Sequence, residues 1–106
     1  MEKVIKALET NSGRLQKIRD LLGKEEMLAG LAEESAELGQ AALKLRRALD
    51  GLNPTDKPAI DADEDLQEEI ADVLLYAWMC NIDTGLVAET IYKKSRRWYS
   101  RMKIDG

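Results

Sequence analysis

Three glutamates lie within five positions of one another in the stretch LAEESAELGQ, which covers residues 31 to 40. A helix turns by about 100° per residue, so Glu34 and Glu37 lie about 60° apart on one side of it. The residues at neighbouring angles are mostly small or apolar: Met27, Gly30, Ala41 and Ala48. We therefore expect Glu34 to border the buried seam of a helix, with Glu37 just beyond it in a stripe of small side chains.

Glu33 differs from the other two, because it projects near Gln40 and Lys44 on a face that it shares with polar residues. We expect this face to be solvated. Glu33 therefore lies further from the buried seam than Glu34 and Glu37.

A second carboxylate pair repeats the arrangement later in the chain. Glu69 and Asp72 are also three residues apart, whereas Glu68 points elsewhere. The apolar and aromatic residues that share their face are Val73, Tyr76 and Cys80. Two helices are thus each expected to present a pair of carboxylates to the interior.

Such a cluster would be costly without partners, because desolvation and mutual repulsion both disfavour ionised carboxylates and raise their pKa values. A divalent cation would balance the charge. An all-oxygen site favours Mg²⁺ first and Mn²⁺ second, and the absence of His excludes the Glu-x-x-His pairs of di-iron bundles. The competing interpretation is that EExxE is also common on exposed helices, where it is solvated and pairs with Lys. With the second pair, the residues favour a magnesium site that would take the phosphates of a substrate.

The elements that must position these carboxylates are four helices, and no segment shows the strict alternation of a half-buried strand. The longest has apolar residues at three- and four-residue steps and ends at Asp50 and Gly51. Residues 51 to 63 contain both prolines and are predicted as a loop. The predicted helices cover residues 2 or 14 to 22, residues 24 to 50, residues 63 or 65 to 82, and residues 86 to 103.

Caps and an apolar segment complete the predicted architecture. Ser12 is a candidate N-cap for the first helix, Gly23 its stop, and Asp83 or Thr84 a candidate N-cap for the last helix. The second half of the third helix is apolar on every side, so it must be covered by its own bundle or by a second subunit. We expect one all-α domain over residues 1 to 106, built like a four-helix bundle and assembled as a homodimer or homotetramer.

Composition limits the classes of function. Of 106 residues, 44% are hydrophobic and the formal net charge is −4, which argues against a general nucleic-acid surface. Cys80 is the only cysteine, so no intrachain disulfide can form, and we expect it to be inert core. The longest uninterrupted apolar run, VLLYAWMC, is too short to cross a bilayer. We expect a soluble cytoplasmic protein that binds neither membrane nor nucleic acid.

The carboxylate motifs also carry a resemblance to a known family. LAEESAELGQAALKL followed by DLQEEIADVLLY resembles the all-α nucleoside triphosphate pyrophosphohydrolase superfamily, in its MazG-like branch, whose signature is EExxE, a spacer and ExxD. The resemblance covers about residues 25 to 101. It implies a helical bundle that forms dimers or tetramers and a hydrolase that uses Mg²⁺ to split (deoxy)nucleoside triphosphates into monophosphate and pyrophosphate.

The same resemblance assigns roles to the acidic residues. It implies that the metal ligands are Glu34, Glu37, Glu69 and Asp72. Glu33 matches the first glutamate of the signature, which implies a role at a second metal or in orienting the attacking water. Glu33 and Glu37 are the two candidates for positioning that water.

The family also carries a basic pair on its last helix that meets the phosphates. Here the matching stretch is YKKSRRWYSRM, in which Lys94 with Arg97 is the favoured register and Lys93 the competing one. Arg101 shares the face of Lys94 and Arg97, although basic residues at a helix end also simply complement the helix dipole. Asn81 could reach a sugar or phosphate from the helix of the second motif, or bond to backbone.

Two other functions stay open at the level of sequence. Phosphoribosyl-ATP pyrophosphohydrolases resemble the same superfamily, but their second motif commonly continues with a His where this chain has Ala77. The other alternative is a non-catalytic helical interaction module that keeps the carboxylates as a relic or as a structural metal site. The base and sugar of a nucleotide substrate are not predicted by either motif.

Overall fold

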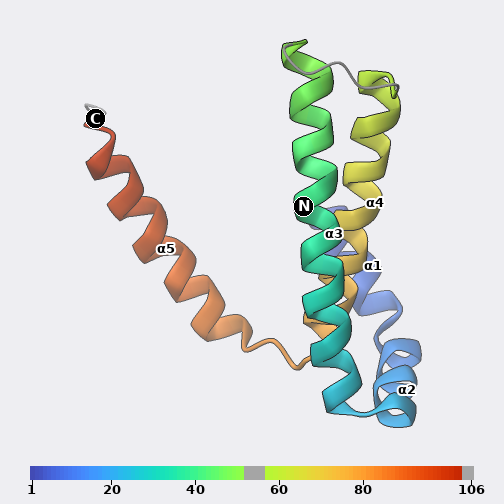
Figure 1. Cartoon of the computed structure of the whole chain (residues 1–106). Helices are drawn as coiled ribbons and strands as arrows, with labels where there is room; N and C mark the ends of the chain where they lie inside the picture. Colours follow the sequence, from blue (N-terminus) through green and yellow to red (C-terminus); the bar gives the residue numbers. More distant parts are fainter. Residues whose placement is uncertain (52–56, 104–106) are drawn as a thin grey trace.

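The computed structural model describes residues 1 to 51 and 57 to 103, and over these residues the chain is all helical, with no strand. The all-α prediction is confirmed for this part of the chain. The part of the chain that the structure describes forms five helices where the sequence predicts four: α1 (Glu2–Thr10), α2 (Ser12–Leu22), α3 (Lys24–Asp50), α4 (Ala59–Met79) and α5 (Thr84–Arg101) (Figure 1).

The extra helix arises because the predicted first helix is interrupted at Asn11. The backbone N–H of Asn11 makes the last helical bond of α1, to the carbonyl of Ala7 at 3.1 Å, and the side-chain amide of Asn11 donates to the same carbonyl at 2.7 Å. Asn side chains compete with helix continuation in this way. Ser12 then becomes the first residue of α2 instead of its N-cap, so that prediction is corrected.

The bounds of α3 agree with the prediction, because glycine marks each end. Gly23 has φ +91° and Gly51 has φ +68°, and a residue with a side chain rarely adopts either. The helix between them ends in a left-handed glycine cap, as the sequence indicates.

The bounds of α4 differ from the prediction at both ends. Pro58, with φ −60° and ψ 151°, precedes the helix directly, and Asp61 lies in the first turn of α4. The helix therefore starts at Ala59, within the predicted loop, and it ends at Met79 instead of continuing to residue 82. Residues 52 to 56 of that loop lie outside the described residues.

The main packing of the molecule is between α3 and α4, which run antiparallel along each other (Figure 1). Gly30 permits a close approach on α3, because a Cβ built there would lie 2.1 Å from Cε1 of Tyr76 on α4. A small buried cluster of Leu15, Met27 and Met79 joins α2 to this pair. The α3/α4 pair is thus the rigid part that positions the carboxylates.

The last helix is set apart from the others. Asp83 caps α5 by accepting a hydrogen bond of 3.0 Å from the backbone N–H of Leu86, which confirms one of the two predicted caps. None of the residues of α5, all of which the structure describes, is buried, and Figure 1 shows the helix running away from the other four. The Cα radius of gyration is 16.9 Å, whereas about 13 Å is typical of a compact domain of this length.

The described residues contain no helix with the length and apolar character needed to cross a membrane. The apolar second half of α4 is only partly covered within one chain. Between residues 72 and 80 only Met79 is buried, and the other residues are half-buried.

Candidate metal centre

Three of the predicted ligands meet between α3 and α4. Glu34 and Glu37 come from α3 and Glu69 comes from α4, and each offers a carboxylate oxygen within 4.8 Å of those of the other two. The spacing of three residues on α3 places two of these groups one turn apart, and the antiparallel pairing brings the third opposite them. The arrangement is a compact, all-oxygen cluster.

Two oxygens in this cluster have no hydrogen-bond partner among the described residues. Oε2 of Glu34 and Oε2 of Glu69 are buried and accept no hydrogen bond from any described residue. The residues themselves are half-buried, whereas Glu37 is exposed. Buried acceptors without donors are costly, so a bound cation or proton would relieve both groups.

The electrostatics agree with the geometry. Burial, followed by the neighbouring Glu37, raises the pKa of Glu34 from 4.5 to about 7, and Glu69 and Asp72 add to the shift. Burial is also the main cause that raises the pKa of Glu69, and the charges of Glu37 and Asp72 raise it further. The contact between Glu69 and Glu34 lowers the pKa of Glu69, but the net shift is upward. The cluster therefore favours one bound proton near neutral pH when nothing else neutralises it.

Asp72 and Glu33 lie differently from the three central glutamates. Asp72 is half-buried and close enough for its charge to act on Glu34 and Glu69, but it is not one of the three groups whose oxygens meet. Glu33 is exposed and outside that group, in agreement with its predicted position away from the seam.

An open groove adjoins the cluster, because Glu37 and Glu69 also line a cavity of about 330 Å³ between α3 and α4. Four of its lining residues are acidic, and Lys44 is the only cation among the described ones. Asp65, one of the four acids, is ion-paired with Lys57. The full lining is Glu37, Gln40, Ala41, Lys44, Ala62, Asp65, Glu68 and Glu69.

The sequence predicts a solvated face for Gln40 and Lys44, and both residues are exposed, but both also line this groove. The helical angle between Glu37 and Lys44 could have placed Lys44 in the groove. Lys44 follows Glu37 by seven residues, which is about 20° short of two full turns, so both side chains lie on nearly the same side of the helix. Glu68 was likewise expected to point elsewhere, yet it lines the groove.

The predicted phosphate-binding residues lie on α5, away from the carboxylates of the same chain (Figure 1). Lys94, Arg97, Trp98 and Arg101 line one depression of about 220 Å³, so the predicted basic face exists. Lys93 pairs with Glu89 at 3.1 Å, one turn earlier on α5. Within a single chain the structure does not bring these cations to the carboxylates.

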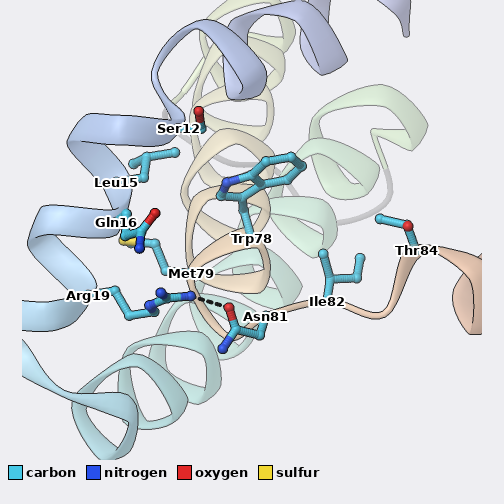
Figure 2. Close-up of a pocket in the computed structure, with 9 residues that line it drawn as sticks. All are labelled: Ser12, Leu15, Gln16, Arg19, Trp78, Met79, Asn81, Ile82 and Thr84. Carbon is cyan, nitrogen blue, oxygen red and sulfur yellow. Dashed lines mark hydrogen bonds between the residues drawn. The ribbon is translucent and has the colours of Figure 1, made fainter.

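Asn81 lies beyond the end of α4, so it does not project from that helix as predicted. It has φ +61°, and its side-chain oxygen accepts a hydrogen bond from Nη1 of Arg19. Figure 2 shows both residues at the edge of a pocket of about 260 Å³ between α2 and the end of α4. The remaining lining residues are Ser12, Leu15, Gln16, Trp78, Met79, Ile82 and Thr84.

The donor set fits a hard divalent cation. Three carboxylate oxygens already converge, two buried oxygens lack donors, and no described nitrogen or sulfur ligand belongs to the group. Comparisons with protein-family models, with curated proteins and with solved structures found no match to this chain.

Proposed function

We propose that this protein is a Mg²⁺-dependent nucleotide pyrophosphohydrolase that cleaves (deoxy)nucleoside triphosphates to the monophosphate and pyrophosphate. The observation that carries the proposal is the convergence of Glu34, Glu37 and Glu69 within 4.8 Å, with two buried oxygens lacking donors. The EExxE and ExxD motifs that supply these groups resemble those of the MazG-like branch of the superfamily. Manganese is a second candidate ion.

Glu34, Glu37 and Glu69 would hold the ion, with Asp72 beside them. When bound, Mg²⁺ supplies positive charge that offsets the carboxylates and polarises phosphate oxygens. Glu37 is the best-placed group to orient an attacking water, because it is exposed and borders the groove as well as the cluster. Glu33, which faces solvent, is the weaker candidate for that role.

The proposal includes a homo-oligomer. An exposed apolar stripe runs along one face of α5, formed at four- and seven-residue steps by Val87, Ile91 and Trp98. These side chains are 38%, 61% and 70% exposed, respectively. Lys94, Arg97 and Arg101 flank this stripe. Packing of α5 on a second copy would cover the stripe and bring the basic residues to a neighbouring chain. The open shape of one chain, with extents of 45 × 42 × 25 Å, and the half-covered α4 support the same assembly.

The test is to incubate purified protein with Mg²⁺ and a panel of canonical and damaged (deoxy)nucleoside triphosphates, and to quantify pyrophosphate against orthophosphate. We expect pyrophosphate and an equal amount of monophosphate. Glu69→Gln should lose this activity, whereas Glu64→Gln, on an exposed position of the same helix, should keep it.

Phosphoribosyl-ATP belongs in the same panel. Turnover of that substrate alone would indicate a phosphoribosyl-ATP pyrophosphohydrolase. Binding of Mg²⁺ without turnover of any phosphate substrate would contradict the enzymatic proposal. That result would favour the non-catalytic helical module.

A further inference from the structure

We propose that Lys44 is a phosphate-binding residue of the groove, where its ammonium group contacts the polyphosphate of the nucleotide within the same chain. This inference rests on the proposed function, since it assigns a substrate contact at that site. It concerns a residue that neither carboxylate motif contains and that the basic residues of α5 do not include.

The geometry of α3 directs Lys44 toward the carboxylates. Lys44 lies two turns after Glu37, about 10 Å further along the axis and only about 20° away in angle. Helical side chains lean toward the N-terminus of their helix, so the four-carbon stem of Lys44 extends back toward Glu37. Both residues line the same cavity, and Glu69 closes it from α4.

The charge of the groove gives Lys44 a specific task. Glu37, Glu68 and Glu69 all face the cavity, and a polyphosphate entering it would be repelled by them even with a cation at the cluster. Lys44 is the only positive side chain among the described residues of the lining. A lysine ammonium acts as a point charge for phosphate oxygens, which is the contact needed here.

Lys44 is also available for this contact. Among the described residues it has no ion pair within 4.0 Å, whereas Lys57 is held by Asp65 and Lys93 by Glu89. It is exposed, and it lies on the best-packed pair of helices. Each chain therefore carries this cation at its own groove, independently of where α5 lies.

The experiment is a calorimetric titration of the full-length protein, in excess Mg²⁺, with an α,β-imido deoxynucleoside triphosphate that cannot be cleaved, and with inorganic tripolyphosphate. Lys44→Met should weaken binding of both probes about tenfold or more, as expected for loss of a charged hydrogen bond. Lys44→Arg should retain most of the affinity. Lys24→Met, at the exposed start of the same helix, is the matched control and should bind as the wild type does.

Two further readouts separate a phosphate contact from a structural effect. The affinity of the wild type should fall more steeply with salt than that of Lys44→Met, because one fewer charge pair is screened. Mg²⁺ binding and helix content should be unchanged by the substitution. A Lys44→Met variant that binds both probes as tightly as the wild type would overturn the inference alone.

The outcomes also distinguish this inference from the proposed function. If the wild type binds tripolyphosphate through Lys44 but cleaves no nucleotide, the function is wrong and the phosphate contact stands. If the wild type binds neither probe in the presence of Mg²⁺, both are overturned.

Discussion

The α3/α4 pair and α5 are opposite kinds of structure within one short chain. The pair is held by close packing at Gly30 and Tyr76 and concentrates acidic groups. The last helix is capped by Asp83, carries basic groups, and has no buried residue along its described length. The proposed site needs both metal ligands and positive side chains that contact phosphate. The α3/α4 pair provides both by itself only if Lys44 supplies the positive charge.

The largest expected effect is on the acidic side of this comparison. Glu34→Gln removes a central charge of the cluster, and Mg²⁺-dependent turnover should fall by about a thousandfold or more, as for loss of a catalytic metal ligand. The metal-free variant should remain helical and should be at least as stable as the wild type near pH 8, because the repulsion with Glu37 is relieved. Steady-state kinetics and circular dichroism measure the two quantities. Full activity in this variant would remove Glu34 from the ligand set.

The next effect concerns α5 and should appear as a change of assembly. Ile91→Glu places a charge in the exposed apolar stripe, and a homo-oligomer that uses this stripe should dissociate toward monomers. Sedimentation or light scattering measures the change in mass. Leu49→Glu, at another exposed apolar position, on α3, is the control and should leave the mass unchanged. An unchanged mass for Ile91→Glu would show that the helix does not form the interface.

A smaller effect tests the packing of the pair itself. Gly30→Ala inserts a methyl group where Tyr76 already lies, and it should destabilise the protein by about 1 to 3 kcal/mol. Gly39→Ala, on the same helix with open space around it, should instead stabilise by about 0.5 to 1 kcal/mol. Denaturant unfolding measures both. Equal effects of the two substitutions would mean that α3 and α4 are not held as closely as described.

The helices and the acidic cluster could largely be predicted from the sequence because both depend on local rules. Glycines bound α3, and a spacing of three residues directs Glu34 and Glu37 to one side of this helix. Antiparallel pairing of α3 and α4, in the register set by the packing of Tyr76 on Gly30, then brings Glu69 opposite them. Whether these groups act in catalysis stays a prediction.

The features that the sequence did not predict depend on competition or on tertiary contacts. The break between α1 and α2 lies at Asn11, whose side chain bonds to the carbonyl of Ala7, and hydrophobic periodicity does not reveal such a local bond. Lys44 is exposed as predicted, but its place in the groove could not be predicted because α4 forms the opposite wall. The separation of α5 from the other helices is a tertiary feature that no helical pattern specifies.

The most direct test of the central claim, that the carboxylate cluster is a cation site, is the thermal midpoint with and without Mg²⁺ across pH 5.5 to 8. Because the pKa of Glu34 rises from 4.5 to about 7, the folded state binds a proton that the unfolded chain releases. The metal-free wild type should therefore lose stability as the pH rises from about 4.5 through about 7. Glu34→Gln should show a flatter profile.

Magnesium should reverse this loss, because it replaces the proton only when the carboxylates are ionised. The midpoint of the wild type should thus rise with Mg²⁺ at pH 8 and change little at pH 5.5. At roughly 100 times Kd, the added free energy of unfolding at pH 8 should be about 2.7 kcal/mol. A midpoint at pH 8 that does not respond to saturating Mg²⁺ or Mn²⁺ would contradict the claim.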